Sequence, residues 1–348
     1  MPVTINGSDG ITNASWTTGT RPSNPAAGQM GFNTETNALE FYNPILDEWR
    51  PIFAGAINAT GGSVSDITIN GIQYRVHAFT SVGTSTFEVI DGNAVADVLV
   101  VAGGGAGAGG GGGAGGLAFG SVNISEQTYT VKVGAGGPGT SAAFDSGTGD
   151  NGNDSEFDNI TALGGGGGGG NATGGADGGS GGGTGPNSTS NGGSALQSGT
   201  NTGIETGTNT GIESDLGSNG GNGFDANRPN ATAGGGGARE SGGDAIDQFS
   251  PGNGGDGISF ENIFSDQFGE NGHFAGGAAG GGMNDTSSTN TNFLAAGGLG
   301  GGAEGSNNIN PAPAGALPNT GGGGAHGSES FNAGPGGSGI VLIRYRIG

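Results

Sequence analysis

The 348-residue sequence contains no cysteine and few cationic residues. Without cysteine the chain has no disulfide bond and no cysteine-based zinc site, so backbone hydrogen bonds and packing must hold its fold. Only 8 Lys and Arg residues stand against 30 Asp and Glu residues, which gives a formal net charge of −22. Nucleic acids and anionic membranes bind basic surfaces. The charge balance therefore argues against both as partners.

Long apolar runs are also missing. No run of 18 apolar residues occurs, and no charged stretch followed by an apolar core opens the sequence. We therefore expect neither a membrane span nor a secretory signal peptide. Apolar residues make up 31% of the chain, against about 45–50%, glycine included, in ordinary soluble domains. Collagen is excluded as well, because the sequence has only 13 prolines and no Gly-X-Y period.

Glycine is the residue in excess, with 89 copies that are concentrated in blocks. Residues 102–116 are only Gly and Ala, and residues 164–170 are seven consecutive glycines. Such blocks alternate with heterogeneous polar stretches, whereas flexible linkers mix glycine and serine throughout. The alternation indicates an ordered architecture of repeated segments joined by loops.

The stretch VLVVAGGGAGAGGGGG (98–113) looks like the start of a dinucleotide-binding unit, in which a strand leads through glycines into a helix. Here the strand leads into fifteen Gly and Ala residues, eleven of them glycine. At about 1 kcal/mol per glycine relative to alanine, a helix there would lose on the order of 10 kcal/mol. We therefore expect no nucleotide and no other cofactor.

A glycine block that is neither helical nor disordered can adopt the extended threefold helix of polyproline II, which has no internal hydrogen bonds. Parallel helices of this kind can bond to one another, and only a bare Cα permits that close approach. The predicted fold class is therefore mostly irregular and β. We expect a small N-terminal β module, then β-strands that frame a polyglycine-II helix sandwich with long loops.

Changes in composition along the sequence predict four parts. These are an N-terminal module (1–57), a β-rich segment with the first glycine block (58–133), a glycine-rich domain (134–338) and a closing strand (339–348). In the β-rich segment the alternation of ITINGIQYRVHAFTS predicts two strands joined by a turn at Asn70-Gly71. Further strands are expected over STFEVI, VADVLVVA, FGSVNI and QTYTVKV. The apolar closing strand is expected to pair with Val98–Val101.

In the N-terminal module, residues 30–33 and 38–43 are expected to form a hairpin around a turn at 34–37. Trp49 and Ile52 would close a small sheet or cap. A core of some fifty residues is marginal, so oligomerisation is a natural way to stabilise it. The candidates for attachment or oligomerisation are Trp16, Phe32, Leu39, Phe41, Tyr42 and Trp49.

No catalytic or metal-binding motif stands out, and we expect a protein that is not an enzyme. GGNGFDA (220–226) matches the start of a calcium-binding nonapeptide repeat, but no tandem copy follows. DNGND (150–154) clusters carboxylates and amides but lacks the downstream Glu of a calcium loop. The histidines His77, His273 and His326 lack metal-ligand spacing. We expect no bound metal.

Aromatic residues between glycine blocks are the best candidates for binding a partner, because large apolar side chains dominate recognition. SFENIFSDQFGENGHF (259–274) is the richest stretch, and a helix capped by Ser259 and ended by Gly269 is expected there. An alternative is that its rings face inward and cover the glycine sandwich. The receptor-binding candidates are Phe249, Phe260, Phe264, Phe268, His273, Phe274 and Phe293. The duplicated NTGIETGTNTGIESDL (201–216) is expected to be a solvated loop.

The stretches VADVLVVAGGGAGAGGGGGAGGL, TYTVKVGAGGPG and GGSGIVLIRYRI, with the repeated glycine blocks, resemble the glycine-rich domain of bacteriophage tail-fibre adhesins. TTGTRPSNPAAGQMGFNTETNALEFYN similarly resembles a short module of fibre proteins in tailed phages, notably those of marine and cyanobacterial hosts. The resemblance implies a virion protein that attaches to other tail proteins by its N-terminus and binds a host-surface protein or glycan by its loops, as a homotrimer. The alternatives are a structural virion connector without a receptor, an ice-binding protein and a disordered chain.

Overall fold

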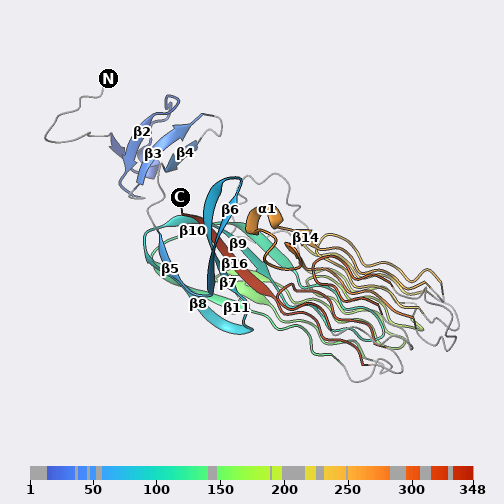
Figure 1. Ribbon diagram of the computed structural model, residues 1–348. Coiled ribbons are helices and arrows are strands. Elements are labelled where there is room, and N and C mark those ends of the chain that lie inside the picture. Colours follow the sequence, from blue (N-terminus) through green and yellow to red (C-terminus); the bar gives the residue numbers. More distant parts are fainter. Residues whose placement is uncertain are drawn as a thin grey trace.

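In the computed structural model of the protein the chain is almost entirely β-strand and extended segments (Figure 1). The structure describes residues 14–35, 38–44, 48–51, 57–139, 147–188, 190–197, 216–224, 231–247, 250–282, 295–305, 315–327 and 332–347. Within these ranges no helix is long and apolar enough to cross a membrane. The predicted class, mostly β and irregular, is confirmed.

The N-terminal module is a four-stranded sheet in the order β1-β2-β3-β4. Its elements are β1 (Ser15–Trp16), the 3-10 helix η1 (Thr18–Thr20), β2 (Met30–Asn33), β3 (Ala38–Asn43) and β4 (Glu48–Pro51). The first and last residues predicted for both hairpin strands are confirmed. Trp49 lies in β4, which pairs with β3. Residues 36 and 37 of the predicted turn lie outside the described residues, as does Ile52.

Two five-stranded sheets form a β-sandwich, with strand orders β10-β9-β16-β7-β6 and β13-β12-β11-β8-β5. The strands are β5 (Asn58–Thr60), β6 (Ser63–Ile69), β7 (Ile72–Phe79), β8 (Gly83–Asp91), β9 (Ala94–Val101), β10 (Leu117–Ile124), β11 (Gln127–Val133), β12 (Ser155–Phe157), β13 (Ile160–Ala162) and β16 (Ile340–Arg346). Phe87, Val98, Tyr129, Phe157 and Val341 belong to the core between the sheets. Strands β9 and β16 are apolar on both faces because a second apolar cluster covers the outer face.

Two local predictions about the sandwich are confirmed. Strand β16 pairs antiparallel with β9, so that Ile340 lies opposite Val101, and the glycine domain is an excursion between neighbouring strands. The turn between β6 and β7 is at Asn70 and Gly71, whose φ angles are 51° and 79°. Asn and Gly are the residues that tolerate this left-handed conformation best.

The first glycine block shows a threefold helix through its hydrogen bonds. Ala102, Gly105 and Ala108 donate to Gly116, Gly113 and Gly110; Gly103 and Ala106 donate to Asn153 and Asp150; Gly104 and Gly107 donate to Gly337 and Gly334. The same neighbour therefore returns at every third residue. Carbonyl groups of residues 103–108 accept from three further segments, which begin near residues 134, 164 and 321. Six neighbours around one threefold segment are the polyglycine-II arrangement.

Glycine is needed in these blocks because neighbouring backbones approach very closely. A Cβ atom added at Gly103 would lie 2.0 Å from the carbonyl oxygen of Ala135, and one added at Gly105 would lie 2.2 Å from that of Gly166. Both distances are far inside van der Waals contact. We call this packed set of extended segments the glycine lattice.

The segments of the glycine lattice run back and forth between two ends (Figure 1). The proximal end adjoins the β-sandwich, where the first block leaves β9 and returns to β10. The distal end is the opposite one, where the first block turns at Ala108 to Gly110 through a 3.0 Å hydrogen bond. Gly282 and Ala295 lie at the distal end, whereas Gln197 and Leu216 lie at the proximal end.

Candidate functional site

The aromatic stretch 259–274 lies at the proximal end, against the outer face of the sheet that contains β9 and β16. It contains β14 (Ile258–Ser259), the short helix α1 (Glu261–Phe264) and β15 (His273–Phe274). The helix is much shorter than predicted and its N-cap is Phe260, not Ser259. It ends early because Ser265 adopts a left-handed φ of 68° while its N–H still donates to Glu261.

The rings of this stretch face inward, and three receptor candidates are corrected on this point. Phe260, Phe264 and Phe274 are at most 1% exposed and pack in the cluster that covers the outer face of the sheet. A side chain without exposed surface cannot contact a receptor, so the inward alternative holds for these three. Phe268 and His273 are partly exposed. Phe249 and Phe293 lie outside the described residues.

Arg344 of β16 fixes this aromatic cover to the sheet. Its guanidinium contacts Asp97 at 2.6 and 3.0 Å and donates to the carbonyl oxygen of Ile263, within α1. Its Cζ atom lies 4.2 Å from the ring centroid of Tyr74, a cation–π contact. The sequence offered a signal for this cluster, an arginine inside an otherwise apolar strand, but no indication of its partners.

The distal end of the glycine lattice is the better candidate for binding a partner. Phe224 and Ile246 lie there, at the ends of outward-running segments, with 37% and 74% of their surfaces exposed. Sequence reasoning missed both residues. The available signal was an apolar residue directly after a glycine-containing segment, as in NGGNGF (219–224).

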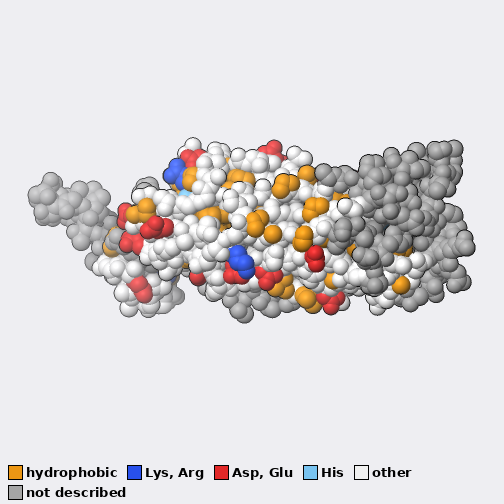
Figure 2. Space-filling model, turned by 90° about the horizontal axis from the view of Figure 1, so that it is seen from below, with side chains coloured by type: hydrophobic (Ala, Val, Ile, Leu, Met, Phe, Trp, Pro, Cys, Tyr) orange, Lys and Arg blue, Asp and Glu red, His pale blue; other side chains and the backbone are white. Residues whose placement is uncertain are grey.

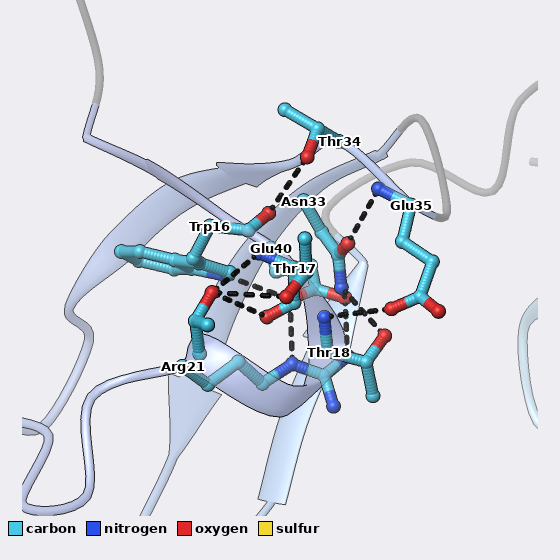
Figure 3. Close-up of polar contacts among 9 residues, drawn as sticks. Trp16, Thr17, Thr18, Arg21, Asn33, Thr34, Glu35 and Glu40 are labelled. Atoms are coloured by element: carbon cyan, nitrogen blue, oxygen red, sulfur yellow. Dashed lines mark hydrogen bonds and ion pairs between the residues drawn. The ribbon is translucent and has the colours of Figure 1, made fainter.

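The N-terminal module is organised around a buried carboxylate (Figure 3). Glu40 is 2% exposed and accepts from Trp16 Nε1 at 3.2 Å, from Asn33 Nδ2 at 2.9 Å and from Arg21 at 2.6 and 3.0 Å. Burial alone would raise the pKa of Glu40, but the hydrogen bonds from Arg21, Trp16 and Asn33 outweigh it and hold the pKa below its usual value.

The six attachment candidates divide between the two faces of this sheet. Trp16 is buried, and its ring lies 4.6 Å from that of Trp49, which in turn lies 5.8 Å from Tyr42. Strand pairing places Phe32, Leu39, Phe41 and Met30 together on the opposite face. All four of these side chains are partly or largely exposed, so this is the apolar face that the module offers to a partner.

We predict that Glu40→Gln lowers the stability of the N-terminal module by about 1–2 kcal/mol, because it weakens a charge-assisted pair with Arg21 inside a part-buried site. Both tryptophans of the chain, Trp16 and Trp49, are in the module. Urea unfolding followed by tryptophan fluorescence therefore reports the module alone. Glu35→Gln is the control, since Glu35 accepts from the Thr18 N–H at an exposed position. Equal midpoints for the two variants would refute the prediction.

One motif considered for metal binding contributes side-chain hydrogen bonds to the lattice. In DNGND (150–154) the side chains of Asn151 and Asp154 accept backbone N–H groups of Gly167 and Gly164 at 2.9 and 2.7 Å. Across the described ranges no group of three His, Asp or Glu residues is placed to hold a metal ion. His77 and His326 are fully buried, and Asp225 in GGNGFDA lies outside those ranges.

The sequence model of the glycine-rich domain family matches residues 80–346. The match begins next to β8, ends at the last residue of β16 and includes the entire glycine lattice. It leaves out the N-terminal module. No curated protein matches the chain.

Proposed function

This chain belongs to the glycine-rich domain family, and we propose that it is a bacteriophage tail-fibre or tail-tip protein whose glycine lattice presents receptor-binding loops to the host surface. In this proposal the N-terminal module attaches the chain to other tail proteins and holds it as a homotrimer. The protein then acts by binding, in the virion, and not by catalysis.

The observation that carries the proposal is that many segments of a rigid scaffold end together at its distal end. Each central segment of the lattice is fixed by six hydrogen-bonded neighbours, so the ends of the segments are held in fixed relative positions. Recognition residues are typically found on loops that a rigid scaffold positions. Exposed Phe224 and Ile246 add apolar contact area at this end.

The exposed apolar face of the N-terminal module supports the second part of the proposal. A single-layer sheet of this size buries one face, here with Trp16 and Glu40, and leaves Phe32 and Phe41 partly exposed on the other. Small domains of this kind are commonly stabilised by oligomerisation or by docking on a partner.

The test is binding of the purified full-length protein to a panel of bacterial cells, with two loop-shortened variants. One replaces residues 283–294, between Gly282 and Ala295 of the distal end, by a short Gly-Ser connection. The other does the same to residues 198–215, between Gln197 and Leu216 of the proximal end. We expect saturable binding that the distal variant loses by at least tenfold and the proximal variant retains. Equal loss in both variants would overturn the assignment to the distal end. Stable, folded protein that binds no strain would favour a structural connector.

A further inference from the structure

The sides of the glycine lattice raise a problem that the fold must solve. Each threefold segment points its N–H groups in three directions, so a segment at the side of the lattice has N–H groups with no neighbouring backbone to receive them. An unpaired row of backbone donors is a template for a second chain, as at the edge of a β-sheet. In this lattice the second chain would be another copy of the same protein.

The first solution is a ladder of side-chain acceptors with a spacing of three residues. Asn151 and Asp154 take the N–H groups of Gly167 and Gly164, which have no backbone acceptor. The residues that follow these two glycines, Gly165 and Gly168, donate to backbone carbonyls of the first glycine block. The side chains thus occupy the one donor direction of residues 164–169 that lacks a backbone neighbour.

The same ladder occurs twice more, on other segments. Asn219 and Asn222 accept the N–H groups of Ala195 and Gly192 at 2.8 and 3.1 Å. Asn253 and Asp256 accept those of Ala296 and Leu299 at 3.0 and 2.9 Å. In each pair the acceptors are three residues apart, as are the amides that they receive. Because the same geometry occurs three times on different segments, it is a recurrent structural feature and not a chance contact.

The second solution is proline, which has no N–H to leave unpaired. Gly334 and Gly336 donate to two different neighbouring segments, so the third direction falls to Pro335, which is exposed. Pro138 is likewise exposed and follows Gly137, which donates into the first glycine block. The φ angle of proline, near −65°, fits an extended threefold helix.

We propose that these Asn/Asp ladders and prolines are lattice-edge caps, which stop a second copy of the chain from docking sideways on the glycine lattice. The caps matter because both partners in such docking would offer the same rows of donors and acceptors. Asp and Glu side chains occur at more places than Lys and Arg side chains on the face that Figure 2 shows, in line with the formal net charge of −22. This excess of negative charge adds long-range repulsion between copies, but salt screens it beyond about 10 Å. The caps act at contact distance, where salt does not remove their effect. This inference does not depend on the proposed function.

The test compares two double variants of the same segment by multi-angle light scattering across a hundredfold range of concentration. N151G/D154G removes a ladder, whereas D150G/N153G removes one Asp and one Asn at the same spacing. Asp150 and Asn153 are exposed and bond in the lattice through backbone groups: both carbonyls accept, and the Asn153 N–H donates to Ala135. The two variants therefore have the same change in charge and in glycine content.

A third variant, P138G/P335G, adds two N–H groups at another side of the lattice without removing any hydrogen bond. We expect N151G/D154G and P138G/P335G to form concentration-dependent multiples of the wild-type mass, and D150G/N153G to keep the wild-type mass. Wild-type mass for both test variants at every concentration would overturn the proposal. So would faster amide exchange at Gly164 and Gly167 without any increase in mass, because the ladder would then only stabilise its own segment.

Discussion

Gly107→Ala is expected to prevent the glycine lattice from forming. A Cβ atom at this position would lie 1.8 Å from the carbonyl oxygen of Ala325 and 2.4 Å from its carbonyl carbon. Neither group can move away, since Gly107 donates to Gly334 and the next residues of the Ala325 segment donate back to the first glycine block. We expect a loss of more than about 4 kcal/mol, which is a large part of the total stability of an ordinary domain.

The matched control is Gly147→Ala, because a Cβ atom there meets nothing within 4 Å and the residue is exposed. Both variants gain one methyl group, so any difference comes from the lattice contact. Far-ultraviolet circular dichroism and amide exchange of residues 102–116 measure the loss, while tryptophan fluorescence shows whether the N-terminal module remains folded. Equal thermal midpoints for the two variants would mean that the lattice is looser than its hydrogen bonds indicate.

The strands and their turns were predictable from the sequence because their signals are local. The bounds of β2 and β3 follow from alternation and turn residues, and Asn70-Gly71 marks its turn through the conformations that those residues tolerate. The pairing of β16 with β9 is long-range, but two strongly apolar strands at the borders of the glycine region had few other partners. The polyglycine-II arrangement could be predicted from the glycine content, because few other ordered backbone conformations are open to segments made almost entirely of glycine.

The neighbours within the lattice and the roles of its side chains were not predictable. Glycine blocks carry no side chains that distinguish one neighbour from another, so nothing in the sequence pairs Gly104 with Gly337 or Gly105 with Gly113. For the same reason Asn151 and Asp154 stood out only as part of a cluster of carboxylates and amides, with no indication that they accept backbone N–H groups. The spacing of Phe260, Phe264 and Phe268 predicted a helix that offers these rings to a receptor. Instead the rings pack against the apolar outer face of the sheet.

Acidification is expected to destabilise the β-sandwich and the glycine lattice through two buried histidines, His77 of β7 and His326 of the lattice. Burial lowers the pKa of His326 to about 4 and also lowers the pKa of His77. His77 Nδ1 lies 2.7 Å from the carbonyl oxygen of Gly61, which can only accept, so Nδ1 donates and Nε2 accepts from the hydroxyl of Tyr345 at 3.0 Å. The neutral imidazole of His77 therefore has both of its hydrogen bonds, and a second proton has no acceptor ready.

The sign of the pH effect follows from the lowered pKa values. Below about pH 6.5 the unfolded chain binds protons at these histidines while the folded chain does not, so stability is complete above that pH and falls as the pH approaches 4. For His326 alone the loss is on the order of 2 kcal/mol at pH 5, at about 1.4 kcal/mol per pKa unit. Acidification also reduces the net charge of −22 and its self-repulsion. The contribution of His326 is therefore obtained only from the difference in pH dependence between variants.

The measurement is therefore urea unfolding at pH 7.5 and pH 5 for the wild type and two variants, followed by circular dichroism. His326→Gln is expected to remove on the order of 2 kcal/mol of the pH dependence, although the substitution itself lowers stability at both pH values. His273→Gln is the control, because His273 lies partly exposed in β15 and its change leaves the buried histidines intact. A pH dependence that is the same in His326→Gln and the wild type would show that His326 is protonated equally in the folded and unfolded chains. The acid sensitivity would then have to arise at His77 or among the carboxylates, and His77→Gln at the same two pH values distinguishes these sources.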